Sequence, residues 1–198
     1  MSAYVLFFGG YKATRKDVDL WSASAKSQMP DVTFDSYPWP AAARNSDAKS
    51  AVAAFTHAGS LAQAIATVEK CGTGLVYIVG HSSGCAIARA VDSGLKDTSK
   101  VVLVALDGFV PYPGQMSRPT TQVWAAVCGK EVSRNHDDLK KAVGGRLKIY
   151  KATDCYKPAA LHFSVVNSAA NDTAVKDIPT GYTNCRANLV WMQSQAGG

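Results

Sequence analysis

The chain has 198 residues, of which 47% are hydrophobic and 18% charged, values typical of a globular protein and not of a disordered one. This length suffices for one domain with a full core, so we expect residues 1–198 to form a single domain. The net charge of +6 would suit an anionic partner such as nucleic acid, a membrane or an acyl-phosphopantetheine group. The basic residues are scattered, however, so no nucleic-acid partner is expected. The densest basic clusters are Lys12-Arg15-Lys16, Lys140-Lys141 and Arg146-Lys148-Lys151.

Short β-rich apolar runs alternate with longer amphipathic segments along the whole chain. This alternation predicts a parallel sheet covered by helices on both faces. The expected strands are residues 4–8, 32–37, 74–79, 100–106, 122–128 and 146–152. The expected helices are residues 14–28, 47–70, 84–95, 135–143 and 183–195. Lys148 and Lys151 interrupt the sixth strand, which favours an edge position for it because lysines commonly protect sheet edges.

The apolar runs are shorter than about ten residues, whereas a membrane span needs roughly twenty, so no membrane span is expected. No signal peptide precedes the first strand, which favours a cytoplasmic location. The five cysteines form no CxxC pair and have no metal-ligand spacing, so we expect neither a metal nor another cofactor. Their odd number fits a reducing compartment, although a Cys155–Cys185 disulfide in a secreted form stays open. The sequence does not indicate an oligomeric state.

The stretch GLVYIVGHSSG, residues 74–84, contains a G-x-S-x-G pentapeptide between an expected strand and an expected helix. A sharp strand-to-helix turn predicts a strained backbone at Ser82 and an exposed hydroxyl. Side chains two residues before and two residues after this serine would collide with the turn, which accounts for Gly80 and Gly84. The alternative is an ordinary glycine-rich turn in which a serine caps the helix.

This strand-GHSSG-helix arrangement resembles the α/β-hydrolase fold, and the turn resembles those of thioesterases that act on acyl chains from polyketide and nonribosomal peptide assembly. The resemblance covers most of the chain as an order of elements, but its motifs are confined to short stretches. It implies a three-layer, doubly wound, mainly parallel sheet of about six strands. It also implies that Ser82 is a nucleophile served by an acid and a histidine that follow it in that order along the chain.

A serine hydroxyl needs a base to accept its proton, and two histidines follow Ser82. His162 lies in a loop after the last expected strand, where this fold delivers its histidine, and it is our candidate base. A packed histidine on an apolar face is the alternative for it. His136 lies in the polar stretch RNHDDLKK, which is typical of an exposed helix start. We therefore interpret His136 as a surface residue.

Three carboxylates are candidates for the residue that orients His162. Asp107 directly follows the apolar run VVLVAL, and the string VVLVALDGFVP resembles the thioesterase pattern in which a strand ends in the catalytic aspartate. Glu131 follows the next strand, where many hydrolases of this fold carry their acid. Asp154 follows the last strand and is the remote third choice. We assign Asp107 and keep Glu131 open.

Two backbone amides are expected to stabilise the oxyanion. One belongs to Ser83, the residue after the nucleophile. The other belongs to Gly10 or Tyr11 in the FFGGYKA turn, where two glycines let the backbone approach closely. If the first and third strands flank the point at which the winding reverses, this turn and Ser82 share one rim of the sheet. A Gly-Gly pair is also a common turn, so this assignment depends on the strand order.

Residues 108–121 are too few and too rich in proline and glycine to form a helical lid, so we expect an open site without one. His81 is adjacent to the nucleophile and is expected to pack under the turn or to line the pocket. The candidate apolar wall of the site consists of Tyr11, Phe109, Pro111, Tyr112 and Phe163, each of which could equally be ordinary packing.

Together these features predict a serine hydrolase that cleaves an ester or a thioester of a small or carrier-bound acyl group. The thioesterase and carboxylesterase activities both stay open. So do an acyltransferase, in which another nucleophile replaces water, and a non-catalytic binding protein built on a hydrolase fold.

Overall fold

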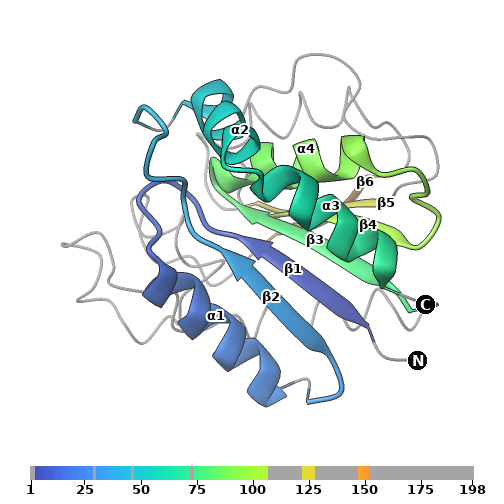
Figure 1. Cartoon of the computed structure of the whole chain (residues 1–198). Coiled ribbons are helices and arrows are strands. Elements are labelled where there is room, and N and C mark those ends of the chain that lie inside the picture. The colour runs from blue at the N-terminus through green and yellow to red at the C-terminus, as the bar shows by residue number, and fades with distance from the viewer. Residues whose placement is uncertain are drawn as a thin grey trace, which may run out of the picture.

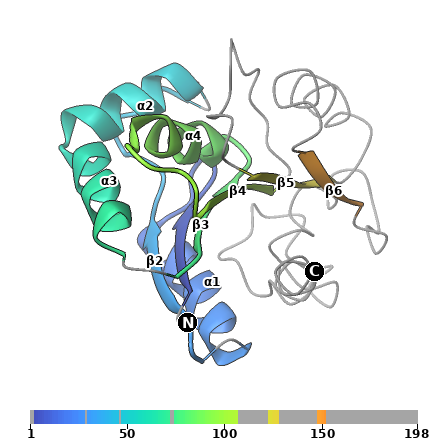
Figure 2. The same cartoon turned by 90° about the vertical axis from the view of Figure 1, so that its right-hand side faces the viewer.

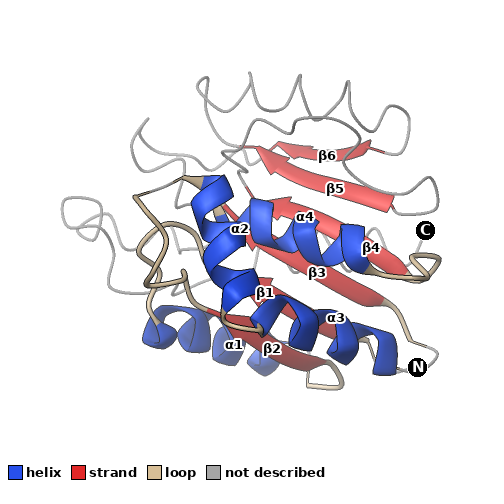
Figure 3. Ribbon diagram, turned by 45° about the horizontal axis from the view of Figure 1, so that its top comes forward, coloured by secondary structure: helices blue, strands red, loops and turns tan. Residues whose placement is uncertain are grey.

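The computed structural model describes residues 3–28, 30–45, 47–71, 74–106, 122–127 and 147–151. These residues form a six-stranded sheet whose order is β2-β1-β3-β4-β5-β6, with every neighbouring pair parallel (Figure 3). The strands are β1 (Tyr4–Phe8), β2 (Thr33–Tyr37), β3 (Val76–His81), β4 (Val101–Leu106), β5 (Gln122–Val127) and β6 (Leu147–Lys151). All six lie within two residues of the expected ranges, and β6 occupies an edge, as its lysines indicated.

Helices cover both faces of the sheet. The helices are α1 (Arg15–Gln28), α2 (Ala48–His57), α3 (Ser60–Lys70) and α4 (Gly84–Gly94). Helix α1 packs against one face, and α2, α3 and α4 lie over the other (Figures 1 and 2). The predicted three-layer, doubly wound parallel sheet is therefore confirmed. The helices expected at 135–143 and 183–195 lie outside the described residues.

Strand β1 is the centre of two apolar cores, because its five residues are all buried and alternate between the two faces. On the α1 side, the Phe7 ring stacks on Trp21 with ring centroids 4.0 Å apart. On the other side, Leu6 and Phe8 join the larger core under α2, α3 and α4. The carboxyl end of β1, where the candidate site begins, is thus fixed from both sides.

The single helix expected over residues 47–70 is wrong. The chain forms two helices, α2 and α3, which are bent by 78° relative to each other. The cause is Gly59, which adopts a left-handed conformation with φ of 74° after the end of α2. Ser60 then begins α3 in a new direction.

In the part of the chain that the structure describes, no single helix is long and apolar enough to cross a membrane. Helices α2 and α3 together satisfy the length and composition of a span, although they are bent. Each also buries residues in the core of the protein: Ala51 and Phe55 in α2, and Ala64 and Val68 in α3.

The order of the strands places a winding reversal between β1 and β3, since β2 lies on one side of β1 and β3 on the other. Ligands of open α/β sheets bind at such a point, outside the carboxyl ends of the strands. The turn after β1 and the turn after β3 both leave the sheet there. The predicted switch point is therefore confirmed.

Candidate active site

Ser82 directly follows β3 and has φ of 54°, in the left-handed region that serine seldom adopts. Such a conformation costs about 1–2 kcal/mol, so the surrounding structure must impose it. The Ser82 backbone N–H donates to the Leu106 carbonyl at 3.0 Å, and the Ser82 carbonyl accepts from the Cys85 N–H at 3.1 Å. These bonds tie the serine to the end of β4 and to the first turn of α4. The strained backbone expected at Ser82 is confirmed. The exposed position expected for it is wrong, because Ser82 is buried, with 7% of its surface exposed.

Strand β3 extends two residues further than expected, through Gly80 and His81. Their backbones pair with Ala105 and Leu106 of β4, and this pairing does not depend on apolar side chains. As a result, the paired part of β3 continues to the residue directly before Ser82.

Both flanking glycines are required by close backbone contacts. A Cβ on Gly80 would lie 2.5 Å from the Cys85 Cα, inside the first turn of α4. A Cβ on Gly84 would lie 2.5 Å from the Gly9 carbonyl oxygen and 2.6 Å from that of Phe8. At Gly80 the expected clearance for the turn is thus confirmed, and Gly84 makes room for the end of β1.

The turn after β1 lies directly against Ser82. A Cβ on Gly10 would be 2.9 Å from the Ser82 Cβ and 3.0 Å from the His81 carbonyl oxygen. Two segments far apart in sequence therefore meet at one rim of the sheet. The predicted oxyanion site required the turn after β1 to lie beside Ser82, and this contact meets that requirement.

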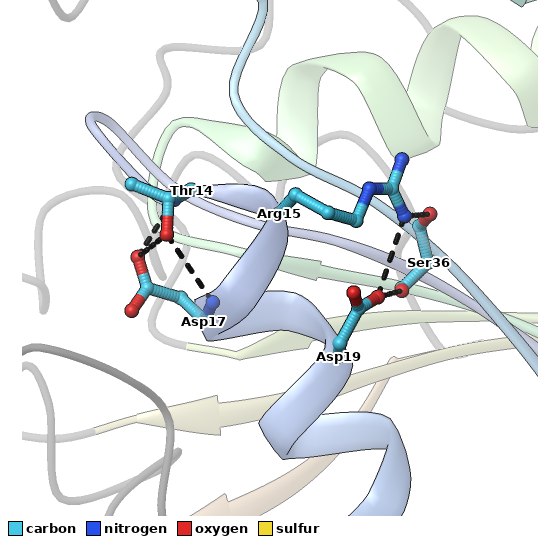
Figure 4. A network of polar contacts seen from close by, with 5 residues as sticks. All are labelled: Thr14, Arg15, Asp17, Asp19 and Ser36. Carbon is cyan, nitrogen blue, oxygen red and sulfur yellow. Dashed lines mark hydrogen bonds and ion pairs between the residues drawn. The ribbon is translucent and has the colours of Figure 1, made fainter.

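Backbone hydrogen bonds and a helix cap hold the shape of this turn. The Gly9 N–H donates to the Tyr37 carbonyl at 3.0 Å, and the Ala13 N–H donates to the Gly10 carbonyl at 2.9 Å. Thr14 and Asp17 then cap α1 reciprocally (Figure 4): Thr14 Oγ1 accepts from the Asp17 N–H at 3.3 Å, and the Asp17 carboxylate accepts from the Thr14 N–H at 2.7 Å. The turn is therefore pinned at both ends.

The expected oxyanion donors are placed as follows. Ser83 is 1% exposed and precedes α4, so its amide lies at the positive end of that helix. Among the described residues, neither the Ser83 nor the Tyr11 amide N–H donates a hydrogen bond. Both amides are thus available to an acceptor, and their convergence on one oxygen stays a prediction.

His81 is buried, with 1% of its surface exposed. Its Nδ1 lies 3.1 Å from the position that a Cβ on Gly10 would take. The imidazole therefore packs against the turn after β1, while the two roles expected for it, under the turn at Ser82 or in the pocket, stay predictions.

Two features of this rim were missed by sequence reasoning. Trp39, in the loop after β2, is buried, and its ring meets the Tyr11 ring edge-on with centroids 5.9 Å apart. Lys12 has φ of 64° and places its ammonium 5.3 Å from the centre of the Tyr11 ring. In the sequence, Trp39 follows an expected strand, but nothing there shows that this strand pairs with β1 and so brings Trp39 to Tyr11.

The other predicted site residues lie outside the described residues: Asp107, Phe109, Pro111, Tyr112, Glu131, His136, Asp154, His162 and Phe163. In the chain, Asp107 directly follows Leu106, whose carbonyl accepts the Ser82 N–H and which pairs with His81. Cys155 and Cys185 also lie outside, while Cys71 and Cys85 are not in disulfides. In the described part of the chain, no three His, Cys, Asp or Glu side chains are grouped as metal ligands would be.

The strongest described pKa shift lies away from this rim, between β1 and β2. Burial raises the pKa of the Tyr4 hydroxyl well above its usual value, and its hydrogen bond to the Asp35 carboxylate at 2.6 Å raises that pKa further. Burial, followed by Asp35, also raises the pKa of the Cys71 thiol. These groups stay protonated at neutral pH and serve the packing of the sheet edge.

No protein-family profile and no curated protein sequence matches the chain. Solved structures do. A hydrolase of the α/β superfamily from Xanthomonas campestris is 16% identical, with a TM-score of 0.51 over 75% of this chain and 86% of its own. A lipase-esterase related protein from Clostridium acetobutylicum is 11% identical, with a TM-score of 0.54 over 89% of this chain and 93% of its own. The chain therefore has the α/β-hydrolase fold.

Proposed function

We propose that the protein is a serine hydrolase that cleaves a carboxylic ester or an acyl thioester through an acyl-Ser82 intermediate. The observation that carries this proposal is the left-handed backbone of Ser82, at the switch point of the sheet and in contact with the turn after β1. An ordinary capping turn does not account for this conformation, because the N-cap position of α4 is taken by Ser83, whose side chain makes no capping hydrogen bond. Strain of this kind is typical of functional positions.

In the proposed reaction, Ser82 Oγ attacks the acyl carbon while His162 accepts its proton. Asp107 holds the imidazole in the required orientation, with Glu131 as the other candidate. The carbonyl oxygen becomes an oxyanion, which the amides of Ser83 and of Gly10 or Tyr11 stabilise.

Collapse of this tetrahedral intermediate breaks the bond to the leaving oxygen or sulfur, which takes the proton from His162. A water molecule then attacks the acyl-Ser82 ester with His162 again as base. The products are a carboxylic acid and the regenerated serine. No cofactor is required by this chemistry.

The expected substrate is a small or carrier-bound acyl compound, with Phe109, Tyr112 and Phe163 as the candidate wall for the acyl chain. Described features support a site that needs little rearrangement: Ser83 and His81 are buried, and the turn after β1 is held by Tyr37 and by the cap of α1. A pre-organised site of this kind stabilises developing charge without a reorganisation cost.

Labelling with a fluorophosphonate probe tests the proposal. We expect the wild type to be labelled and Ser82→Ala to resist. Ser83→Ala is the matched control, and we expect it to be labelled because it removes the neighbouring hydroxyl but retains the backbone N–H. Labelling of Ser82→Ala at the wild-type rate would exclude Ser82 as the nucleophile.

A further inference from the structure

The turn that touches Ser82 contains a second strained residue. Lys12 has φ of 64°, and besides Ser82 and Asn45 it is the only residue other than glycine with positive φ among the described residues. Lysine has no side-chain group that favours the left-handed region, unlike asparagine. Strain at an exposed position next to a candidate nucleophile indicates a functional constraint.

The ammonium of Lys12 is held at this rim by aromatic packing. It lies 5.3 Å from the centre of the Tyr11 ring, within the range of a cation–π contact. The Tyr11 ring in turn lies edge-on to Trp39, which is 8% exposed and belongs to the main core. The cation therefore lies on a ring that is 38% exposed and that contacts a buried residue of the core.

The distance from Lys12 to the reacting atom suits a charge on the substrate itself. Gly10, two residues earlier, would bring a Cβ to 2.9 Å from the Ser82 Cβ. Two residues of chain span at most about 7 Å, so the Lys12 Cα lies within about 12 Å of the Ser82 Cβ. A carboxylate a few bonds from the scissile carbonyl, or a phosphate at the end of a longer leaving group, can reach this region.

The charges around Lys12 leave a net positive rim. Arg15 is engaged by the Asp19 carboxylate at 3.5 Å and by the Ser36 carbonyl at 2.7 Å (Figure 4). Asp17 is 8% exposed and accepts hydrogen bonds from Thr14. Within the described residues, Lys12 and Lys16 form no ion pair. The acidic groups of this segment are thus occupied, while these two ammonium groups remain available.

We propose that Lys12, placed on the Tyr11 ring, binds an anionic group of the substrate, a phosphate in the leaving group or a carboxylate in the acyl group. Lys16 adds to the same potential. This inference rests on the proposed function, because Ser82 must act on the bound compound. It assigns a use to the basic cluster Lys12-Arg15-Lys16, which the triad chemistry does not need.

Two pairs of thioesters test this specificity and distinguish the two sources of charge. S-acetyl-4′-phosphopantetheine against S-acetylpantetheine varies only the phosphate in the leaving group. S-succinyl-N-acetylcysteamine against its S-butyryl analogue varies a carboxylate in the acyl group. For each pair, kcat/KM of the anionic compound is divided by kcat/KM of the neutral compound. This ratio is measured at low and high NaCl concentration for the wild type, Lys12→Gln and Lys12→Glu. Lys100→Gln is the matched control, since it removes an exposed lysine that directly precedes β4, at the end of the strands opposite to Ser82.

We expect the wild type to favour the anionic member of one pair and Lys12→Gln to reduce that ratio about two- to fivefold, as expected for the loss of an exposed ion pair. Lys12→Glu should reduce it further, high salt should reduce it in the wild type, and Lys100→Gln should leave it unchanged. Hydrolysis without a preference for either anion, or an equal loss for both members of a pair, would overturn this inference alone. Absence of Ser82-dependent hydrolysis of all four thioesters would overturn this inference, whereas the proposed function, which includes carboxylic esters, fails only where Ser82 also resists the fluorophosphonate probe.

Discussion

Replacing Gly10 by alanine perturbs the contact between the turn after β1 and Ser82 without imposing a forbidden backbone, since Gly10 does not have positive φ. The new Cβ would lie 2.9 Å from the Ser82 Cβ, 3.0 Å from the His81 carbonyl oxygen and 3.1 Å from His81 Nδ1. Carbon atoms pack at about 3.5–4.0 Å, so the turn must retreat from Ser82 by about 0.6–1 Å. Overpacking of this kind costs about 1–3 kcal/mol of unfolding free energy.

A displacement of about 1 Å in a catalytic group lowers rates by about 100-fold, so we expect Gly10→Ala to lose about two orders of magnitude in kcat on an aryl ester. Gly59→Ala is the control, because nothing lies within 4 Å of its added Cβ and its φ of 74° makes alanine cost about 1–2 kcal/mol in stability alone. Urea unfolding and kcat are measured for both variants. Wild-type kcat in Gly10→Ala would refute the role of this turn, and wild-type stability would refute the close contact itself.

Three further outcomes follow from the same structure. Asp107→Asn should lose most turnover while Glu131→Gln keeps it, and the reverse result would move the acid to Glu131. Burial and Asp35 raise the folded-state pKa of Tyr4 above its unfolded value, so the unfolding free energy should fall as the pH rises above about 10, by up to about 1.4 kcal/mol per pH unit. Tyr4→Phe should flatten this dependence in urea unfolding. An unchanged alkaline slope in that variant would contradict the role of Tyr4. Trp21→Ala, which removes a fully buried ring stacked at 4.0 Å on Phe7, should cost about 3–5 kcal/mol in urea unfolding, and a loss below about 1 kcal/mol would contradict the packing of α1.

The sheet and the turn at Ser82 could be predicted because their signals are local. Each buried strand is a short apolar run, and in GHSSG the serine, its glycines and the change from strand to helix are adjacent in sequence. Even the position of the turn after β1 followed from one topological assumption, the winding reversal between β1 and β3.

Other features depend on contacts that no local pattern encodes. The break at Gly59 lies within a stretch whose apolar periodicity continues across it, so only the backbone conformation separates α2 from α3. Trp39 reaches Tyr11 because β2 pairs with β1, and Gly84 is required by the backbone of β1. The left-handed conformation of Lys12 has no sequence signal, because lysine rarely adopts it.

The role of Ser82 as nucleophile can be examined by intact-protein and peptide mass spectrometry of the enzyme quenched during turnover of an aryl ester. This role predicts one acyl group on the peptide that contains Ser82 and none on that peptide in Ser82→Ala. Steady hydrolysis by Ser82→Ala at the wild-type rate, or an acyl group on a different residue of the wild type, would contradict it.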